Sequence, residues 1–135
     1  MKIKIYISHS IRGKHGKNAT KKQMRENNDK AILFHRQLKR LYPTTDFYCP
    51  GEHDEFVLIA YTKGFLSEEQ VLQVDCDIVA TCNLLLNYSP DRYISKGMKV
   101  ENDYAVAHGI PIITLTSTQE QELRKINRFL ESLLK

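Results

Sequence analysis

The chain has 135 residues, 41% of them hydrophobic and 27% charged, which is typical of a globular chain and excludes intrinsic disorder. We therefore expect a single domain over residues 1–135. No apolar run reaches the ~18 residues that a membrane span needs, so no membrane partner is expected. The first residues lack the apolar core of a signal peptide, which predicts a cytoplasmic location.

The formal net charge of +4 is unevenly distributed, with many basic residues between positions 12 and 40. Such a segment attracts nucleic acid or a phosphorylated small molecule, or is simply the solvated face of a helix. Nucleic acid is the least favoured of these partners, because the segment has no interleaved aromatic residues and no known binding motif.

The three cysteines, Cys49, Cys76 and Cys82, form neither a CxxC pair nor a zinc-ligand pattern. Cys76 and Cys82 lie in an apolar stretch, where buried free thiols are the simpler interpretation. We expect neither a metal nor a cofactor.

Apolar spacing and turn residues divide the first half of the chain into strands and helices. In chain order, they predict a strand over 2–8, a loop over 10–19, a helix over 21–41, a short strand over 46–49 and a helix over 52–63. The last of these helices carries Phe56, Ile59 and Ala60 on one face.

The second half contains two capping-box patterns, at 67–70 and 117–120, each of which predicts the start of a helix. The predicted elements are a helix through 79, a buried strand over 84–86, a loop over 89–94, a helix up to 109, a strand over 111–115 and a terminal helix through 134.

Alternating strands and helices predict an α/β fold, a doubly wound, flavodoxin- or Rossmann-like parallel sheet of four to five strands with helices on both faces. Ligands bind such sheets beyond the carboxyl ends of the strands, where the strand order reverses. The candidate loops are 8–18 and 89–94.

The loop after the first strand has the composition of a phosphate-binding site. Its residues are Ser8, His9, Ser10, Ile11, Arg12 and Gly13. Arginine supplies paired donors, and glycine lets backbone amides approach an anion. The Walker A pattern is absent, and an ordinary polar loop explains these residues equally well.

A second motif joins Ser95 and Gly97 to Glu101 at the start of a predicted helix. Ser95 either caps the helix or binds an anion together with the Gly97 amide. The helix dipole favours the ionised form of Glu101, which suits attack on an anomeric carbon. From these residues alone, a surface carboxylate that complements the dipole is the preferred interpretation.

Two further acidic positions are candidates. Asp75 and Asp77 lie in an apolar setting, where a buried carboxylate is costly unless it has a role, although a solvated helix face is about equally plausible. His53 is either a phosphate or sugar contact or merely exposed.

Taken in order, these segments resemble the nucleoside 2-deoxyribosyltransferase superfamily, and most closely its 2'-deoxynucleoside 5'-phosphate N-hydrolase branch. The resemblance covers most of residues 3–115. Its segments are Tyr6 to Gly13, similar to a Tyr-x-x-Gly-Ser-Ile-Arg-Gly opening; Glu52-His53; Asp75; Ser95-x-Gly97-x-x-x-Glu101; Tyr104-Ala105; and Gly109 to Ile112. His9 departs from the pattern, because it stands where the family has a glycine.

The resemblance implies that Glu101 is the nucleophile, and that Tyr6 and Asp75 position the sugar and assist proton transfer. It assigns the 5'-phosphate to the Ser10–Gly13 loop and Ser95. A glycosyl-enzyme would then be resolved by water or by a second base, with retention of configuration. The resemblance also implies a homodimer with a shared site. A nucleotide-binding module without catalysis is the alternative, and a nucleophilic carboxylate argues against it.

Overall fold

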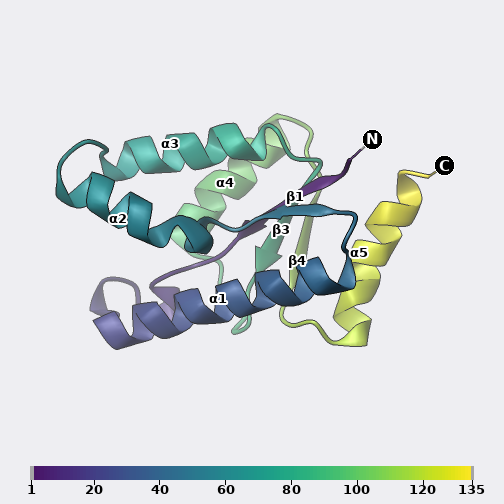
Figure 1. Cartoon of the computed structure of the whole chain (residues 1–135), viewed down its shortest axis with the longest axis horizontal. Coiled ribbons are helices and arrows are strands. Elements are labelled where there is room, and N and C mark those ends of the chain that lie inside the picture. The colour runs from purple at the N-terminus through teal and green to yellow at the C-terminus, as the bar shows by residue number, and fades with distance from the viewer. Residues whose placement is uncertain (1, 135) are drawn as a thin grey trace.

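The computed structural model describes residues 2–134, which form one parallel sheet flanked by helices (Figure 1). The strands are β1 (Lys4–Ser8), β2 (Asp46–Tyr48), β3 (Leu84–Tyr88) and β4 (Ile112–Leu115). All neighbouring strands pair in parallel, in the order β2-β1-β3-β4. This confirms the predicted doubly wound α/β fold, with four strands.

The helices follow the strands in alternation. They are η1 (Gly13–Asn18), α1 (Lys21–Leu41), η2 (Pro50–His53), α2 (Asp54–Thr62), α3 (Glu68–Val79), α4 (Lys96–Ala107) and α5 (Glu120–Ser132). The strand order reverses between β1 and β3, because the chain leaves β1 toward β2 and later returns to the other side of β1. The crevice at the carboxyl ends of β1 and β3 is therefore the place where this fold binds ligands.

Side chains of β1 alternate between two cores, as the two-residue period of a strand requires. Ile5 and Ile7 pack with residues of α1 and α5 on one face of the sheet. Tyr6 packs on the other face, with Val79 of α3 and Ala105 of α4. The sheet is thus covered on both faces, and every second residue of β1 faces α3 and α4.

One of the two predicted helix starts differs from the prediction. The capping box at Ser67 and Gln70 is confirmed, with both reciprocal hydrogen bonds present. The second predicted box is wrong: α5 begins at Glu120 after Gln119, and no side chain caps it. Ser117 Oγ instead accepts a hydrogen bond from the Gln119 amide, which forms a turn before the helix.

The helix predicted over 52–63 is divided into η2 and α2. In η2, the backbone at Gly51 lies close to the side chain of Asn28 on α1. A Cβ at this position would lie 2.5 Å from Asn28 Oδ1, so the absence of a side chain allows the approach. Of the three apolar residues predicted to share a face, Ala60 is buried, whereas Phe56 and Ile59 are exposed.

All three cysteines are free and buried, which confirms the prediction made for Cys76 and Cys82. Within residues 2–134, no helix is both long and apolar enough to cross a membrane.

Candidate active site

The carboxylate of Glu101 meets two hydroxyl groups from β1. Tyr6 and Ser8 are two positions apart on the strand, so both side chains point toward α4. The Tyr6 hydroxyl donates to Oε2 of Glu101 in a short hydrogen bond, and Ser8 Oγ donates to Oε1 at 2.6 Å. One carboxylate thus receives two donors at the carboxyl end of the central strand.

Burial dominates the electrostatics of Glu101. The residue lies in the second turn of α4 and is 5% exposed, which rules out the surface position that its sequence context favours. Burial, with a smaller contribution from Asp75, outweighs the lowering effect of the bonds from Ser8 and Tyr6 and raises the pKa of Glu101 to about 7. The direction is opposite to the expected dipole-favoured ionised form, because burial makes the largest contribution to the shift.

Asp75 of α3 faces the same region. It is half-buried, and burial raises its pKa to about 6. Its charge raises the pKa of Tyr6, although burial and Glu101 contribute more. Two carboxyl groups with raised pKa values and a buried phenol therefore share one site, a pattern typical of acid–base chemistry near neutral pH.

A pair of asparagines fixes the helix that carries Glu101. The side-chain amides of Asn87 and Asn102 donate to each other at 2.8 and 2.9 Å. Asn87 lies on β3 directly opposite Ser8, and Asn102 follows Glu101 on α4. The sequence analysis did not predict this pair. The signal for it in the sequence is Asn87, an asparagine that directly follows the apolar run of β3.

Three aromatic rings form a column that begins at the site. Tyr6 stacks on Tyr48 of β2 with ring centroids 5.7 Å apart, and Tyr48 stacks on His53 at 5.1 Å. The outer ring, His53, is exposed. Tyr48 was not among the predicted residues, although an aromatic residue at the carboxyl end of a strand next to β1 is a usable signal.

The predicted phosphate loop is held in a defined shape. Ser10 Oγ accepts a hydrogen bond from the Gly13 amide at 2.8 Å, and Gly13 has a φ of 61°, which favours glycine. Asn27 of α1 donates to the Ile11 carbonyl at 2.9 Å. Ile11 and Arg12 are exposed, so the guanidinium is available at the surface of the loop.

His9 links this loop to η2. Its Nε2 accepts a hydrogen bond from the Gly51 amide at 3.1 Å. Burial, assisted by His35, lowers the pKa of His9 to about 4, so the ring is neutral at neutral pH. A neutral ring that accepts at Nε2 carries its proton on Nδ1, and this buried donor has no partner among the described residues.

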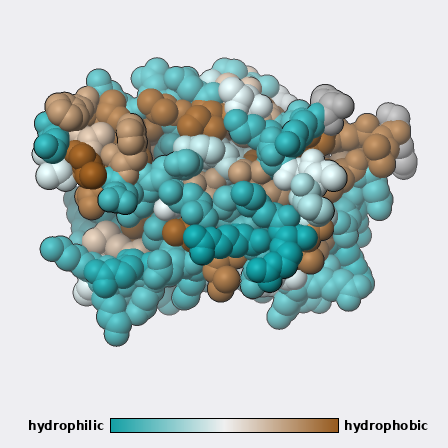
Figure 2. Space-filling model, in the orientation of Figure 1, coloured by the Kyte–Doolittle hydropathy of each residue, from teal (hydrophilic) through white to brown (hydrophobic). Residues whose placement is uncertain are grey.

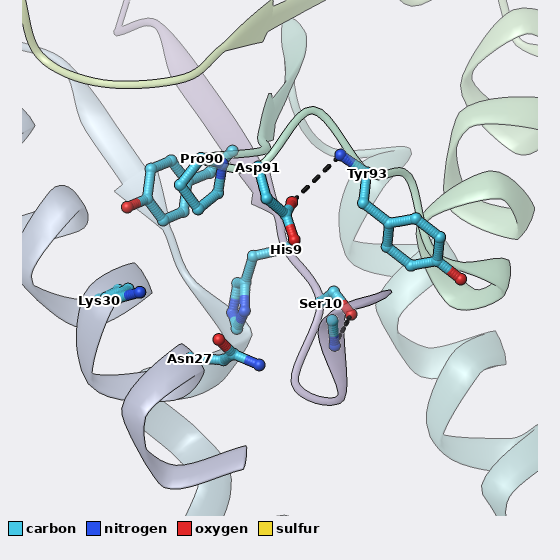
Figure 3. A pocket seen from close by; sticks show the side chains of 9 residues that line it. His9, Ser10, Asn27, Lys30, Pro90, Asp91 and Tyr93 are labelled. Carbon is cyan, nitrogen blue, oxygen red and sulfur yellow. Dashed lines mark hydrogen bonds between the residues drawn. The ribbon is translucent and has the colours of Figure 1, made fainter. Parts of the chain in front are cut away.

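A small cavity of about 20 Å³ lies between the loops that follow β1 and β3. Figure 3 shows His9 and Ser10 between Asn27 and Lys30 of α1 and the Pro90, Asp91 and Tyr93 loop. The cavity lies between the two loops at which the sequence predicts ligand binding, but its volume is roughly that needed by one water molecule. This cavity is too small for a phosphate group.

A wider groove of about 520 Å³ lies at the outer edge of β2. Tyr48 and His53 line it, so it is adjacent to the aromatic column, and Arg36 and Lys39 of α1 add positive charge. Glu52 within the groove contacts Arg36 at 3.5 Å. The volume is in the range of small-molecule sites.

Ser95 caps α4, because its Oγ accepts from the Met98 amide at 3.2 Å. Gly97 lies in the first turn, where backbone amides have no partners within the helix. A Cβ at Gly97 would meet Leu72 only at ordinary contact distance, so packing does not explain the glycine.

Residues 2–134 contain no group of three or more histidine, cysteine, aspartate or glutamate side chains arranged to hold a metal ion. The fold and site define the class of the chain: a doubly wound α/β protein with a buried carboxylate at its switch point.

Comparison with known proteins supports the fold. A solved structure described as a conserved protein from Enterococcus faecalis V583 is similar over 100% of this chain and 76% of its own, with a TM-score of 0.59 and 21% identity. At that identity the similarity shows the fold alone. No protein-family model matches the chain, and no curated protein matches it significantly.

Proposed function

We propose that the chain is an N-glycosidase that acts on a (deoxy)nucleoside 5'-monophosphate, with Glu101 as its nucleophile. The observation that carries the proposal is the pair of hydroxyl groups, from Tyr6 and Ser8, that hold the buried Glu101 carboxylate at the switch point of the sheet. A carboxylate shielded from water and oriented by two donors is prepared for attack on a carbon that develops positive charge.

The proposed reaction has two steps. An oxygen of Glu101 attacks the anomeric carbon while the bond to the base breaks, and the bonding electrons leave with the base. Asp75, whose pKa is about 6, gives the departing base a proton. Water, or a second base, then attacks the same carbon from the opposite side, returns a proton to Asp75 and releases Glu101. Two inversions produce retention of configuration.

Substrate groups are assigned by chemistry. The 5'-phosphate is assigned to Arg12, Ser10 and the amides at the start of α4, which are anion donors at the carboxyl end of the sheet. The base is assigned to the rings of Tyr48 and His53, because flat aromatic surfaces stack on nucleobases. The resemblance to the deoxyribosyltransferase superfamily also implies a homodimer that shares its sites.

The test is to incubate the protein with a panel of (deoxy)nucleoside monophosphates and the matching nucleosides, and to follow base release by chromatography. Glu101→Gln should abolish release, and Glu131→Gln, which changes an exposed carboxylate on α5, should not. Arg12→Ala should raise KM for nucleotides more than for nucleosides.

A free acceptor base in the same assay separates hydrolysis from base exchange, and added methanol traps the intermediate as a methyl glycoside whose configuration reports retention. Binding of nucleotides without turnover across the panel would contradict the enzymatic proposal and support a binding module.

A further inference from the structure

The backbone polar groups of Gly51 in η2 are held by side chains of two other segments. His9, directly after β1, accepts a hydrogen bond from the Gly51 amide at Nε2, over 3.1 Å. Asn28 of α1 donates from Nδ2 to the Gly51 carbonyl over 3.3 Å. Gly51 is buried, and buried backbone groups require such partners. The two side chains therefore fix the place of this residue between β1 and α1.

The contact at Gly51 is tight enough to exclude a side chain there. A Cβ on Gly51 would lie 2.5 Å from Asn28 Oδ1 and 3.1 Å from His9 Cε1. Gly51 is not among the glycines with a positive φ, so its backbone conformation does not itself require glycine. Close packing against the imidazole and the amide explains the residue. Glycine at position 51 is therefore matched to the side chains at positions 9 and 28.

Helix α2, which follows η2 directly, adds little to its anchoring. Within α2 only Ala60 is buried, and Phe56 at its start is 73% exposed. Figure 2 shows hydrophobic surface at the end of the molecule where Figure 1 places α2 and its connection to α3. His35 of α1 lies 3.3 Å from Glu52, which ties η2 to α1 and not to the strand that carries the site. His9 supplies the hydrogen bond that connects η2 to the end of β1.

The turn that His9 holds ends at the outer ring of the aromatic column. His53 is the last residue of η2, directly after Glu52, and its ring stacks on Tyr48 with centroids 5.1 Å apart. In the other direction along the chain, His9 precedes Ser10, whose hydroxyl group shapes the loop assigned to the phosphate. His9 therefore lies between the two surfaces to which the proposed function assigns the base and the phosphate.

We propose that His9 is a positioning residue: its hydrogen bond to Gly51 holds the His53 ring against Tyr48 and so fixes the base-binding surface relative to the phosphate loop. The part of these rings in binding a base rests on the proposed function, whereas the contact itself does not. A glycine, which the resemblance leads us to expect at position 9, has no side chain to make this bond. The neutral imidazole is required, because a protonated ring has donors at both nitrogens.

Nuclear magnetic resonance tests the contact without substrate. In isotope-labelled protein, a coupling across the hydrogen bond should join the Gly51 amide nitrogen to His9 Nε2. The ring current of Tyr48 should shift the ring protons of His53, and His9→Ala should move these signals toward those of a Tyr48→Leu variant. His9→Gln, whose Oε1 reaches the same amide, should preserve them, and the shorter His9→Asn should not. Ile126→Val, a buried change on α5, lowers stability but should leave the His53 signals in place.

Affinities measure what the positioning does for the ligand. In a Glu101→Gln background, which on the proposed mechanism prevents turnover, calorimetry gives the dissociation constants of a nucleoside and of its 5'-monophosphate. Adding His9→Ala should raise both constants about tenfold, and adding His9→Gln should keep both within about threefold. Adding Arg12→Ala, for comparison, should raise mainly that of the monophosphate.

Unchanged His53 signals in His9→Ala would overturn the proposal, and so would a loss of affinity confined to the monophosphate, which would place the effect in the phosphate loop. Absence of base release by the wild-type protein would contradict the glycosidase alone, because the ring signals and the affinities require no turnover.

Discussion

The Glu101 carboxylate is 5% exposed, whereas the Phe56 ring on α2 is 73% exposed. Both values are the reverse of what each side chain prefers, since carboxylates are rarely buried and large aromatic rings rarely remain in water. The hydroxyl groups of Tyr6 and Ser8 donate hydrogen bonds to Glu101, which offset part of the cost of burying its carboxylate. Within the described residues, no comparable contact covers the exposed ring of Phe56.

The difference separates two kinds of functional feature. A buried charge must be stabilised by hydrogen bonds within the chain, so its partners are visible in the structure of a single chain. An exposed apolar helix is stabilised from outside, and its partner has to be inferred from the shape and charge of the surface. Each of the following changes alters one region at a time.

The largest effect is expected at Tyr6. Tyr6→Phe keeps the ring stack on Tyr48 but removes the donor to Glu101, so the carboxylate loses a bond that lowers its pKa. On the proposed mechanism, kcat/KM should fall about 100-fold, and the acid limb of the pH–rate profile, expected near pH 7 in the wild type, should move to higher pH. Tyr42→Phe, which loses the bond to Asn127, is the control. An unchanged acid limb would argue against Glu101 as the titrating group.

Glu101→Gln should stabilise the fold in a pH-dependent manner. Burial raises the pKa of Glu101 from 4.5 to about 7, so between these values the folded state holds a proton that the unfolded state releases. The free energy of unfolding of the wild type therefore falls as pH rises through this window. The glutamine removes that penalty and should add about 1–3 kcal/mol at pH 8 and little below pH 4.5.

Urea unfolding at several pH values, with Glu131→Gln as the reference, measures this difference. An equal gain at both ends of the pH range would show that the pKa of Glu101 is not raised in the folded protein.

Asn102→Ala should cost about 1–2 kcal/mol of unfolding free energy, because it removes two hydrogen bonds to the buried Asn87 and leaves the Asn87 amide only its longer bond to Thr114. The loss should be accompanied by reduced kcat, since the pair fixes α4 beside β3. Asp103→Ala, an exposed change on the same helix, should alter neither quantity. A stable Asn102→Ala variant with full activity would show that the Asn87–Asn102 pair does not position α4.

The smallest effect on the single chain is expected on α2. Phe56→Ser should change the unfolding free energy by less than about 0.5 kcal/mol, because the ring is exposed. Leu85→Ala, in the core, should cost about 2–5 kcal/mol by contrast. A Phe56→Ser loss as large as that of Leu85→Ala would mean that α2 packs within its own chain.

Much of the fold follows from local patterns. The alternation in β1, the short apolar run of β3 and the capping box at Ser67 each correspond to an element of the structure. The predicted box at Ser117 failed because the Ser117 hydroxyl completes a turn with Gln119 instead. Local hydrogen bonds compete at such positions, and the sequence alone does not say which one forms.

For the site, local spacing placed Ser8 in the loop after the first strand and Glu101 near the start of a helix, and the resemblance added Tyr6 and Asp75. Only the tertiary structure decided that Glu101 is buried, that burial raises its pKa, and that Asn87 and Tyr48 belong to its surroundings. Burial and pairing depend on segments distant in the chain. For the same reason, the exposure of Phe56 and Ile59 on α2 became visible only once the helix lay outside the core.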